Sequence, residues 1–552
     1  MSRSRSDHSL PQYADAVAAF DLSAVQAILF APSTGSMNPA EICCDRHAGD
    51  PSRIALRCRN LSGEVSELSF ADLKYHSERL ARLLASLGVT KGDRVAGLLP
   101  RTPELLITIL ATWRLGGVYQ PLFTAFGPKA IEHRLSEGAT KVVVTNGEQR
   151  GKVAQHLVVS VVCVGGSMPG DYDFWGDVEA DDTIDEPVSC TEDDPFLIMF
   201  TSGTTGAAKP LLVPLRAIAA FVRYMVDAVD LRPDDRFWNL ADPGWAYGLY
   251  YAVIGPLALG LTTTFDERPF SVESTIATIR ELGITNLAGS PSAYRLLMGT
   301  GTEAARALRG QLRAVSSAGE PLNAEIIRWF ADAVDTPIFD HYGQTETGMV
   351  LCNHHGLDHP VHVGSAGFAS PGHRVVILSD DGQELGTGVP GVLALDRTRS
   401  PLMWFTGYLG RPTKAFSGNY YLTGDICELN EDGSISFVGR SDDVITTSGY
   451  RVGPFDVESA LLEHAAVLES AVIGKPDPER TEIIKAFVVL QEGYDPSTDL
   501  AEAMRLHVKV RLSAHAYPRE IEFVPSLPKT PSGKLQRFLL RNAEIAKAEQ
   551  AA

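Results

Sequence analysis

Residues 196–210 read FLIMFTSGTTGAAKP, and this stretch decides the fold. Its first five residues are apolar, as in a buried strand. The next ten contain two glycines, four hydroxyl side chains and one lysine. Glycine lets backbone N–H groups approach an anion closely, and the hydroxyl groups add further donors. A strand that runs into such a turn predicts a phosphate-binding loop, although the spacing differs from GxxxxGK[ST]. Taken alone, the segment also fits a polar surface loop.

The sequence on both sides of this loop alternates between helix-like and strand-like segments. The helical pattern FADLKYHSERLARLLASLGV precedes the strand-like DRVAGLLP at residues 93–100, and PELLITILATWRLGGV precedes KVVVT at residues 141–145. Beyond the loop, RFWNL, TTTF, ITNLAGS and RAVSSAG read as further strands. Strands that alternate with amphipathic helices predict an α/β fold, with parallel sheets covered by helices on both faces.

The pattern changes twice towards the C-terminus. After about residue 364, short strands with glycine and proline turns (RVVILSDDG, GVLAL, NYYLTGDICELNEDGSISFVG) predict a small β-barrel or sheet. After residue 440, DVESALLEH reads as a helix, and ESAVIGK and EIIKAFVVL read as strands. We therefore expect a large N-terminal domain of residues 1–440 and a small, mobile α+β C-terminal domain of residues 441–552.

Composition restricts the functional class. The chain has 552 residues, which is more than one hydrophobic core usually serves. A net charge of −19 without a basic block argues against nucleic acid as a partner. The N-terminus has no apolar signal region, and the apolar runs are too short to span a bilayer. Seven scattered cysteines without a CxxC pattern indicate reduced thiols. We expect a soluble cytoplasmic enzyme.

Six motifs in a fixed order resemble those of the acyl-adenylate-forming (ANL) superfamily of acyl-CoA synthetases, peptide-synthetase adenylation domains and luciferases. TSGTTGAAKP is followed by AGEP (318–321), DHYGQTETG (340–348), YLTGD (421–425), GRSDDVITTSGYRVGP (439–454) and PKTPSGKLQR (528–537). The resemblance covers residues 68–537. Within the superfamily, SGYRVGPFDVESAL and AYPREIEF are similar to medium-chain acyl-CoA synthetases, whereas ADPGWAYG is closer to the acetyl- and propionyl-CoA branch.

The resemblance implies an AMP-forming acid–thiol ligase of fatty acid metabolism that uses ATP, Mg²⁺ and CoA. A carboxylate attacks the α-phosphate of ATP to form acyl-AMP and pyrophosphate, and the CoA thiol then displaces AMP. Because two anions must meet in the first step, we expect catalysis by positioning and electrostatic stabilisation. Small molecules are the implied partners, and the sequence leaves the oligomeric state open, a homodimer included.

The resemblance also implies roles for single residues. Glu346 would bind Mg²⁺, which prefers oxygen ligands; Thr345 would contact the phosphates. Asp425 would accept both ribose hydroxyls, and Arg440 would donate to ribose or phosphate. The full set implied to bind the nucleotide is Thr201, Ser202, Gly203, Thr204, Thr205, Gly206, Lys209, Gly319, Glu320, Pro321, Asp340, His341, Tyr342, Gly343, Gln344, Asp425, Arg440 and Arg451. A surface carboxylate is the plain alternative for Glu346, and a turn residue for Asp425.

Three further implied features lie near or beyond the domain boundary. Lys534 would be the main catalyst of adenylation, because a lysine between carboxylate and α-phosphate neutralises their approach; its alternative is a solvated surface lysine. Asp442 would be the hinge about which the small domain rotates between the two half-reactions. The loop with Ser448, Gly449 and Tyr450 would then face the active site and bind CoA.

The acyl pocket is the least specific part of the resemblance. Acetyl-specific relatives carry a tryptophan where this chain has Gly343, so we expect space for a longer chain or a ring. Tyr247 would refill part of that space. The expected walls are Trp245, Ala246, Tyr247, Ala318 and Gly343, each with a core-residue alternative. The balance favours short- to medium-chain acids, with acetate, propionate and small aromatic acids as alternatives.

Three other interpretations stay open. A loader of a carrier protein would show the same motifs, and a catalytically inactive ligand sensor would keep the same fold. Cys352 and four histidines at residues 354, 355, 359 and 362 suggest a metal site, but their spacing matches no usual zinc pattern.

Overall fold

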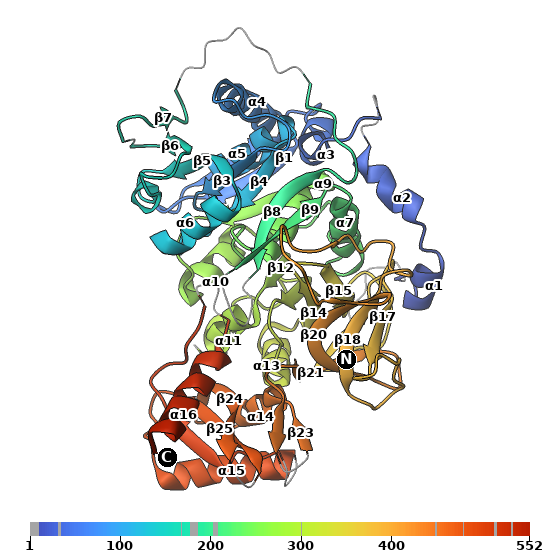
Figure 1. Cartoon of the computed structure of the whole chain (residues 1–552), viewed down its shortest axis with the longest axis vertical. Coiled ribbons are helices and arrows are strands. Elements are labelled where there is room, and N and C mark those ends of the chain that lie inside the picture. The colour runs from blue at the N-terminus through green and yellow to red at the C-terminus, as the bar shows by residue number, and fades with distance from the viewer. Residues whose placement is uncertain are drawn as a thin grey trace.

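The computed structural model describes residues 10–30, 35–166, 168–176, 186–201, 208–299, 301–447, 450–477, 480–512, 516–530 and 534–551. It has a larger part that ends with β21 and a smaller part, from β22 to α16, at one end of the long axis (Figure 1). The described chain has no helix that is both long and apolar enough to cross a bilayer. Each of the seven cysteines lies in these ranges and is a free thiol.

The first sheet has the order β7-β6-β5-β3-β4-β8-β9, and its pairs are parallel except for β8 and β9. Its strands are β3 (Arg94–Leu98), β4 (Val118–Pro121), β5 (Thr140–Asn146), β6 (Ser160–Val164), β7 (Tyr172–Asp173), β8 (Pro195–Thr201) and β9 (Lys209–Pro214). Helix α4 (Phe70–Ser86) precedes β3, α5 (Pro103–Arg114) connects β3 to β4, and α6 (Pro128–Glu137) connects β4 to β5. Val142 and Val144 of β5 join the core that contains α4 and α5, whereas Val143 joins the cluster of α6. Both faces are covered, as the apolar run KVVVT predicts.

The second sheet has the order β10-β12-β13-β14-β15-β16-β21-β20-β18-β17, with β19 paired to β20. Its strands are β10 (Phe237–Asn239), β12 (Asn286–Gly289), β13 (Ala314–Ala318), β14 (Ile338–Gln344), β15 (Gly348–Cys352), β16 (Ser365–Ala369), β17 (Val375–Leu378), β18 (Gly391–Asp396), β19 (Phe416–Ser417), β20 (Tyr420–Leu429) and β21 (Ile435–Arg440). Helices α10 (Val272–Glu281), α11 (Pro291–Gly299), α12 (Thr302–Arg306) and α13 (Ala324–Val334) connect its parallel half.

The pairing changes from parallel to antiparallel at β14. The strands that the sequence predicted as a small β-barrel are β16 to β21, and they continue this sheet as its antiparallel half. Within the described residues, the hydrogen-bonding order runs open from β10 to β17. These strands therefore extend the second sheet and are not a separate unit.

A small third sheet has the order β11-β1-β2, with β11 (Thr263–Asp266), β1 (Ile54–Arg59) and β2 (Val65–Ser69). Strand β11 contains most of the segment TTTF, which the sequence predicted as a strand of the large parallel sheets. The remaining short helices of the larger part are α1 (Tyr13–Ala18), α2 (Leu22–Gln26), α3 (Pro39–Cys43), α7 (Ala217–Asp227), α8 (Ala246–Gly248), α9 (Gly255–Ala258), η1 (Ala27–Leu29), η2 (Asp45–His47), η3 (Arg150–Lys152) and the π-helical η4 (Leu249–Ile254).

The smaller part forms a sheet with the order β23-β22-β25-β24, with β26 paired to β25. Its elements are β22 (Ile445–Thr447), β23 (Tyr450–Val452), α14 (Pro454–Leu462), β24 (Val467–Asp477), β25 (Thr481–Leu490), α15 (Thr498–Arg511), β26 (Glu520–Phe523) and α16 (Arg537–Ala551). It has a hydrophobic core of its own around Val457, Leu461 and Val472.

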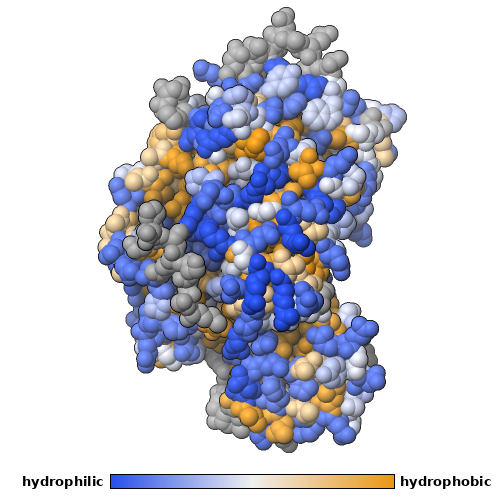
Figure 2. Space-filling view, turned by 180° about the vertical axis from the view of Figure 1, so that it is seen from behind, coloured by the Kyte–Doolittle hydropathy of each residue, from blue (hydrophilic) through white to orange (hydrophobic). Residues whose placement is uncertain are grey.

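Polar and aromatic contacts join the two parts. Asn323 Nδ2 donates to Ser459 Oγ at 2.8 Å, and Arg328 lies 3.8 Å from Glu463. Figure 2 shows a constriction where the smaller part meets the larger one. These contacts hold the smaller part against the second sheet on the side where its strands end.

Candidate active site

A cavity of about 2060 Å³ lies where the parallel strands of both large sheets end. Thr201 ends β8, Ala318 ends β13 and Gln344 ends β14, and all three line it. Residues of α16 and of the segment before it complete its wall from the smaller part. The carboxyl ends of parallel strands are the usual place for ligands in α/β proteins, because the connecting loops gather there.

The cavity brings together most of the predicted site residues. Those that line it are Thr201, Lys209, Trp245, Ala246, Tyr247, Ala318, Gly319, Glu320, Pro321, Asp340, His341, Tyr342, Gly343, Gln344, Thr345, Glu346, Asp425, Arg440, Asp442 and Lys534. Residues Ser202, Gly203, Thr204, Thr205, Gly206, Ser448 and Gly449 lie outside the described residues. Tyr450 and Arg451 belong to β23, whose backbone is described.

Asp425 is a buried carboxylate with several donors around it. Gln344 Nε2 lies 3.0 Å from its Oδ2, the Tyr342 hydroxyl donates to the same oxygen, and Arg440 lies 3.3 Å from Oδ1. Burial raises the pKa of Asp425, and the Arg440 charge opposes that shift. The Tyr421 hydroxyl in turn donates to Gln344 Oε1 at 2.8 Å. The carboxylate is thus held in one orientation.

Glu346 lies in the turn between β14 and β15, and its side chain is buried. The Tyr408 hydroxyl donates to its Oε1 at 2.7 Å. Burial raises the pKa of Glu346, whereas the Tyr408 hydrogen bond and the positive charge of Lys534 oppose the shift. The surface-carboxylate alternative is therefore wrong for this residue.

Glu320 is the second carboxylate near Lys534. The Ser292 hydroxyl lies 3.1 Å from each of its carboxylate oxygens. Burial raises the pKa of Glu320, and the charges of Arg295 and Lys534 oppose the shift. Lys534 is exposed, and its backbone N–H donates to Thr530 Oγ1 at 3.0 Å. Its charge acts on Glu320 and Glu346 together, so it lies at the cavity and is not an isolated surface lysine.

His341 is neutral and has a defined tautomer. Its Nε2 lies 3.1 Å from the Asn353 carbonyl, which can only accept, so Nε2 carries the proton. Its Nδ1 therefore accepts from the Tyr224 hydroxyl at 2.7 Å. Burial lowers the pKa of His341 to about 4, so the ring stays uncharged near neutral pH. The two hydrogen bonds hold the His341 ring in one orientation between Tyr224 and Asn353.

Gly343 serves a purpose other than the one predicted. A Cβ at this position would meet Gly348 O at 2.2 Å and Met349 Cα at 2.7 Å. The pairing of β14 and β15 shifts register at the same place, between Tyr342 and Gly343. The missing side chain therefore lets β15 approach closely and does not by itself open space in the cavity.

The predicted acyl walls are both packing residues and cavity residues. Trp245 lies 5.6 Å from Phe123 and 5.2 Å from Phe126, measured between ring centroids. Tyr247 lies 5.8 Å from Tyr251 in the same way. Both residues also line the cavity, so its apolar end is a rigid aromatic wall.

Several lining residues escaped the sequence analysis. Tyr408, Arg295 and Ser292 lie outside the six motifs. Tyr408 donates to Glu346, whereas Arg295 and Ser292 interact with Glu320. Their partners are distant in the chain, so spacing alone gives no signal. The one available hint for Ser292 was its position in the first turn of α11, just after the end of β12.

Three members of the cysteine and histidine cluster, Cys352, His354 and His355, are buried. His355 stacks on Phe339 with ring centroids 4.1 Å apart, and its Nε2 lies 3.1 Å from the Val315 carbonyl. In the part of the chain that the structure describes, no three His, Cys, Asp or Glu residues are arranged to hold a metal ion.

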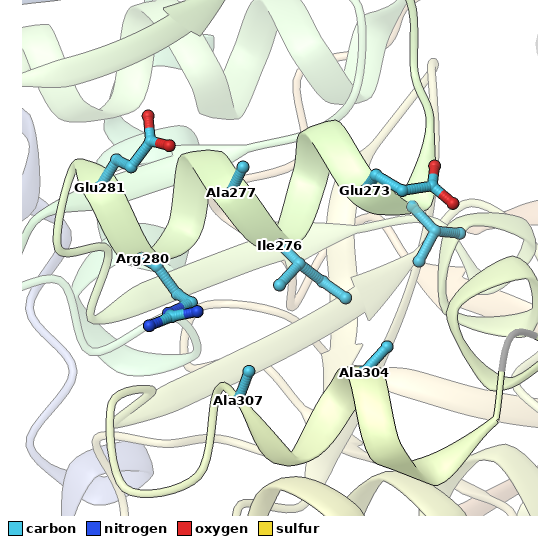
Figure 3. Close-up of a pocket in the computed structure, with 8 residues that line it drawn as sticks. Glu273, Ile276, Ala277, Arg280, Glu281, Ala304 and Ala307 are labelled. Carbon is cyan, nitrogen blue, oxygen red and sulfur yellow. The ribbon is translucent and has the colours of Figure 1, made fainter.

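A separate hollow of about 650 Å³ lies beside α10, where Ile276 and Arg280 point towards the segment that carries Ala304 and Ala307 (Figure 3). Its described lining shares no residue with the predicted site.

The oxygen donors of the main cavity fit Mg²⁺. Proteins usually hold this ion with one or two carboxylates together with substrate phosphates. Glu346 supplies one buried carboxylate, and its pKa stays raised although the Tyr408 hydrogen bond and the Lys534 charge oppose the effect of burial. Thr201 and Thr345 line the same cavity.

Comparisons with known proteins agree with this geometry. A family model described as AMP-binding enzyme matches residues 44–409, and one described as AMP-binding enzyme C-terminal domain matches residues 456–534. Acetyl-coenzyme A synthetase of Bacillus subtilis is 38% identical over 98% of this chain and 96% of its own. 4-Hydroxybutyrate–CoA ligase 1 of Metallosphaera sedula is 35% identical over 90% and 89%. The crystal structure of a Brucella canis acyl-CoA synthetase is 55% identical, with a TM-score of 0.78, over 98% of this chain and all of that one.

The close approach of β15 to Gly343 can be tested by adding one methyl group. Gly343→Ala is expected to lower the free energy of unfolding by about 1–3 kcal/mol, because the backbone of β15 must move. Thermal unfolding would measure the loss, with Gly386→Ala as the control because its Cβ would meet nothing within 4 Å. An unchanged melting temperature would show that Gly343 instead leaves free space in the cavity.

Proposed function

The chain belongs to the family of AMP-binding enzymes, and on that basis we propose that it activates a short- to medium-chain carboxylic acid with ATP and transfers the acyl group to CoA. Its reaction class is that of an acyl-CoA synthetase, an AMP-forming acid–thiol ligase. The single observation that carries the proposal is the cavity that places Thr201, Glu346 and Lys534 on the walls of one space. We place the reaction in the cytoplasm.

We assign residues 1–440 to a domain that binds ATP and the acid, and residues 441–552 to a mobile domain that carries Lys534. Two observations support the division. The smaller part has its own hydrophobic core, and the two family models leave the boundary in the gap between residues 409 and 456.

In the first half-reaction, a carboxylate oxygen bonds to the α-phosphorus of ATP while the bond to pyrophosphate breaks. Both reactants are anions, so their approach needs positive charge at the point of contact. Lys534 would supply it from the mobile domain, and Lys209 would supply it at the end of the phosphate loop. Asp425 and Arg440 would hold the ribose, and Tyr342 would pack on the purine. Mg²⁺ bound to Glu346 would offset charge on the phosphates.

In the second half-reaction, the CoA sulfur bonds to the acyl carbon and the bond to AMP breaks. We propose that the smaller domain first turns about Asp442, which withdraws Lys534 and brings residues 448–451 to the site. Two contacts of Asp442 support this proposal: Arg440 Nε lies 3.4 Å from its Oδ1, and Arg541 donates to its carbonyl at 2.7 Å. It thus contacts a ribose-binding residue on one side and α16 on the other.

The acid is the finer part of the proposal. Relatives named for acetate and 4-hydroxybutyrate support small acids, and the aromatic wall with Trp245 and Tyr247 supports a pocket of limited length. Because Gly343 faces β15, Tyr247 becomes the residue that sets pocket depth. Small aromatic acids remain the alternative, and a carrier protein remains the alternative acceptor.

Pyrophosphate release with ATP, Mg²⁺ and CoA would test the function across straight-chain acids of two to twelve carbons and benzoate. We expect CoA-dependent AMP formation with a maximum between four and eight carbons. A maximum at two or three carbons would show that Tyr247 fills the pocket, and adenylate without thioester would identify a carrier-protein loader. Absence of any acid-dependent pyrophosphate release would refute an enzyme in favour of a ligand sensor.

Lys534→Ala is expected to slow adenylate formation by about 100-fold or more, since it removes the charge between the two anions. Thioester formation from supplied acyl-AMP should change little. Single-turnover assays of each half-reaction would separate the two effects. Lys547→Ala is the matched control, because Lys547 is exposed on α16 and pairs with Glu544 outside the cavity. Equal loss in both half-reactions would refute the assignment.

Asp442→Pro is expected to trap one domain orientation, because proline fixes φ at the proposed hinge. One half-reaction should then fall by about tenfold or more while the other is retained. The same pair of single-turnover assays would detect the imbalance. If both rates stay at the wild-type level, Asp442 is not the hinge.

A further inference from the structure

We propose that Tyr408 is a positioning residue that ties both ends of the phosphate loop to Glu346 and so sets how strongly Mg²⁺ strengthens ATP binding. The inference rests on the proposed function, because it assigns Glu346 to the metal. Tyr408 lies in FTGYLG, outside the six motifs.

The first contact is with Glu346. The Tyr408 hydroxyl donates to Glu346 Oε1 at 2.7 Å, across 62 positions of the chain. Glu346 is buried and Tyr408 is half-buried, and both line the cavity. A donor to one oxygen fixes the carboxylate and leaves Oε2 available for another ligand.

The second group of contacts reaches the two ends of the phosphate loop. Lys209, which begins β9, places its Nζ 5.2 Å from the centre of the Tyr408 ring, within range of a cation–π interaction. Thr201, at the end of β8, lines the same cavity, and its side chain opposes the rise in the pKa of the Tyr408 hydroxyl that burial causes. Tyr408 therefore contacts the residues at both loop ends as well as Glu346.

The segment around Tyr408 is held firmly enough to act as a support. The Leu409 N–H donates to the Pro210 carbonyl at 2.9 Å, and Leu409 packs on the cluster of Ile198 and Phe200. The Tyr408 ring lies 5.2 Å from the Phe405 ring. Arg411 pairs with Glu137 of α6 at 2.6 Å. These contacts hold the backbone and the ring of Tyr408 in place without a ligand.

This geometry predicts a specific fault when the hydroxyl is removed. In Tyr408→Phe, Glu346 keeps its place in the chain but loses the donor that orients it, and Lys209 keeps a ring to pack on. ATP without metal should therefore bind as in the wild type. The additional affinity that Mg²⁺ confers should fall, because the carboxylate no longer points in one direction.

Calorimetric titration with ATP, in EDTA and in excess Mg²⁺ and without acid, would measure this. The ratio of the two dissociation constants is expected to fall about tenfold in Tyr408→Phe, as for loss of one hydrogen bond to a charged group. Tyr420→Phe is the matched control, because that hydroxyl donates to Glu384 Oε1 at 2.8 Å outside the cavity. Its ratio should equal that of the wild type.

A double-mutant cycle then tests the route of the effect. In a Glu346→Gln background, Tyr408→Phe should produce no further change in the ratio, because the group it positions is gone. Equal weakening of both dissociation constants, or additive effects in the cycle, would overturn the inference and leave Tyr408 a packing residue. A wild-type protein that binds no ATP would refute the proposed function, and the inference with it. If Mg²⁺ strengthens ATP binding in the wild type and does so equally in Tyr408→Phe, the inference is refuted while the proposed function stands.

Discussion

The burial of carboxylates around one cavity is the constraint on which the rest of the site depends. Glu320, Glu346, Asp340 and Asp425 all line the cavity, and burial raises the pKa of each. Burial favours the neutral form of each group, and any of them that ionises repels an anionic ligand unless a cation lies beside it. Arg440 and Arg295 supply fixed positive charge from the larger part. Lys534 supplies it from the smaller part, so the charge balance of the cavity depends on where that part lies.

This dependence links the two parts of the molecule. In the orientation described, the Lys534 charge acts on both Glu320 and Glu346, and Asn323 donates to Ser459 across the junction. The same orientation leaves Arg440 between Asp425, the proposed ribose-binding carboxylate, and the boundary residue Asp442. The proposed nucleotide site and the junction with the smaller part thus share one arginine. Such sharing gives a physical route by which one could influence the other.

The sequence predicted the elements well where a pattern belongs to one segment. The apolar run KVVVT became β5 with both faces covered, and the change of pattern after residue 440 matches the smaller core. The sequence was less informative where the position of a strand depends on pairing with a segment far away in the chain. TTTF joined β1 in the small third sheet, and the short strands after residue 364 extended the second sheet. At the site, the motifs predicted which residues line the cavity. They could not predict that a Cβ at Gly343 would point at β15, or that Tyr408 would donate to Glu346, because both depend on three-dimensional geometry.

The pairing of β8 with β9 has a consequence for the loop between them. Thr201 and Lys209 face each other in this antiparallel ladder, so residues 202–208 span a gap that the sheet has already closed. The entropy of bringing the loop ends together is therefore lost on folding and not on ligand binding. A change in the length or composition of that segment would leave the pairing of Thr201 with Lys209 unaltered. The ladder thus fixes both ends of the segment independently of the residues between them.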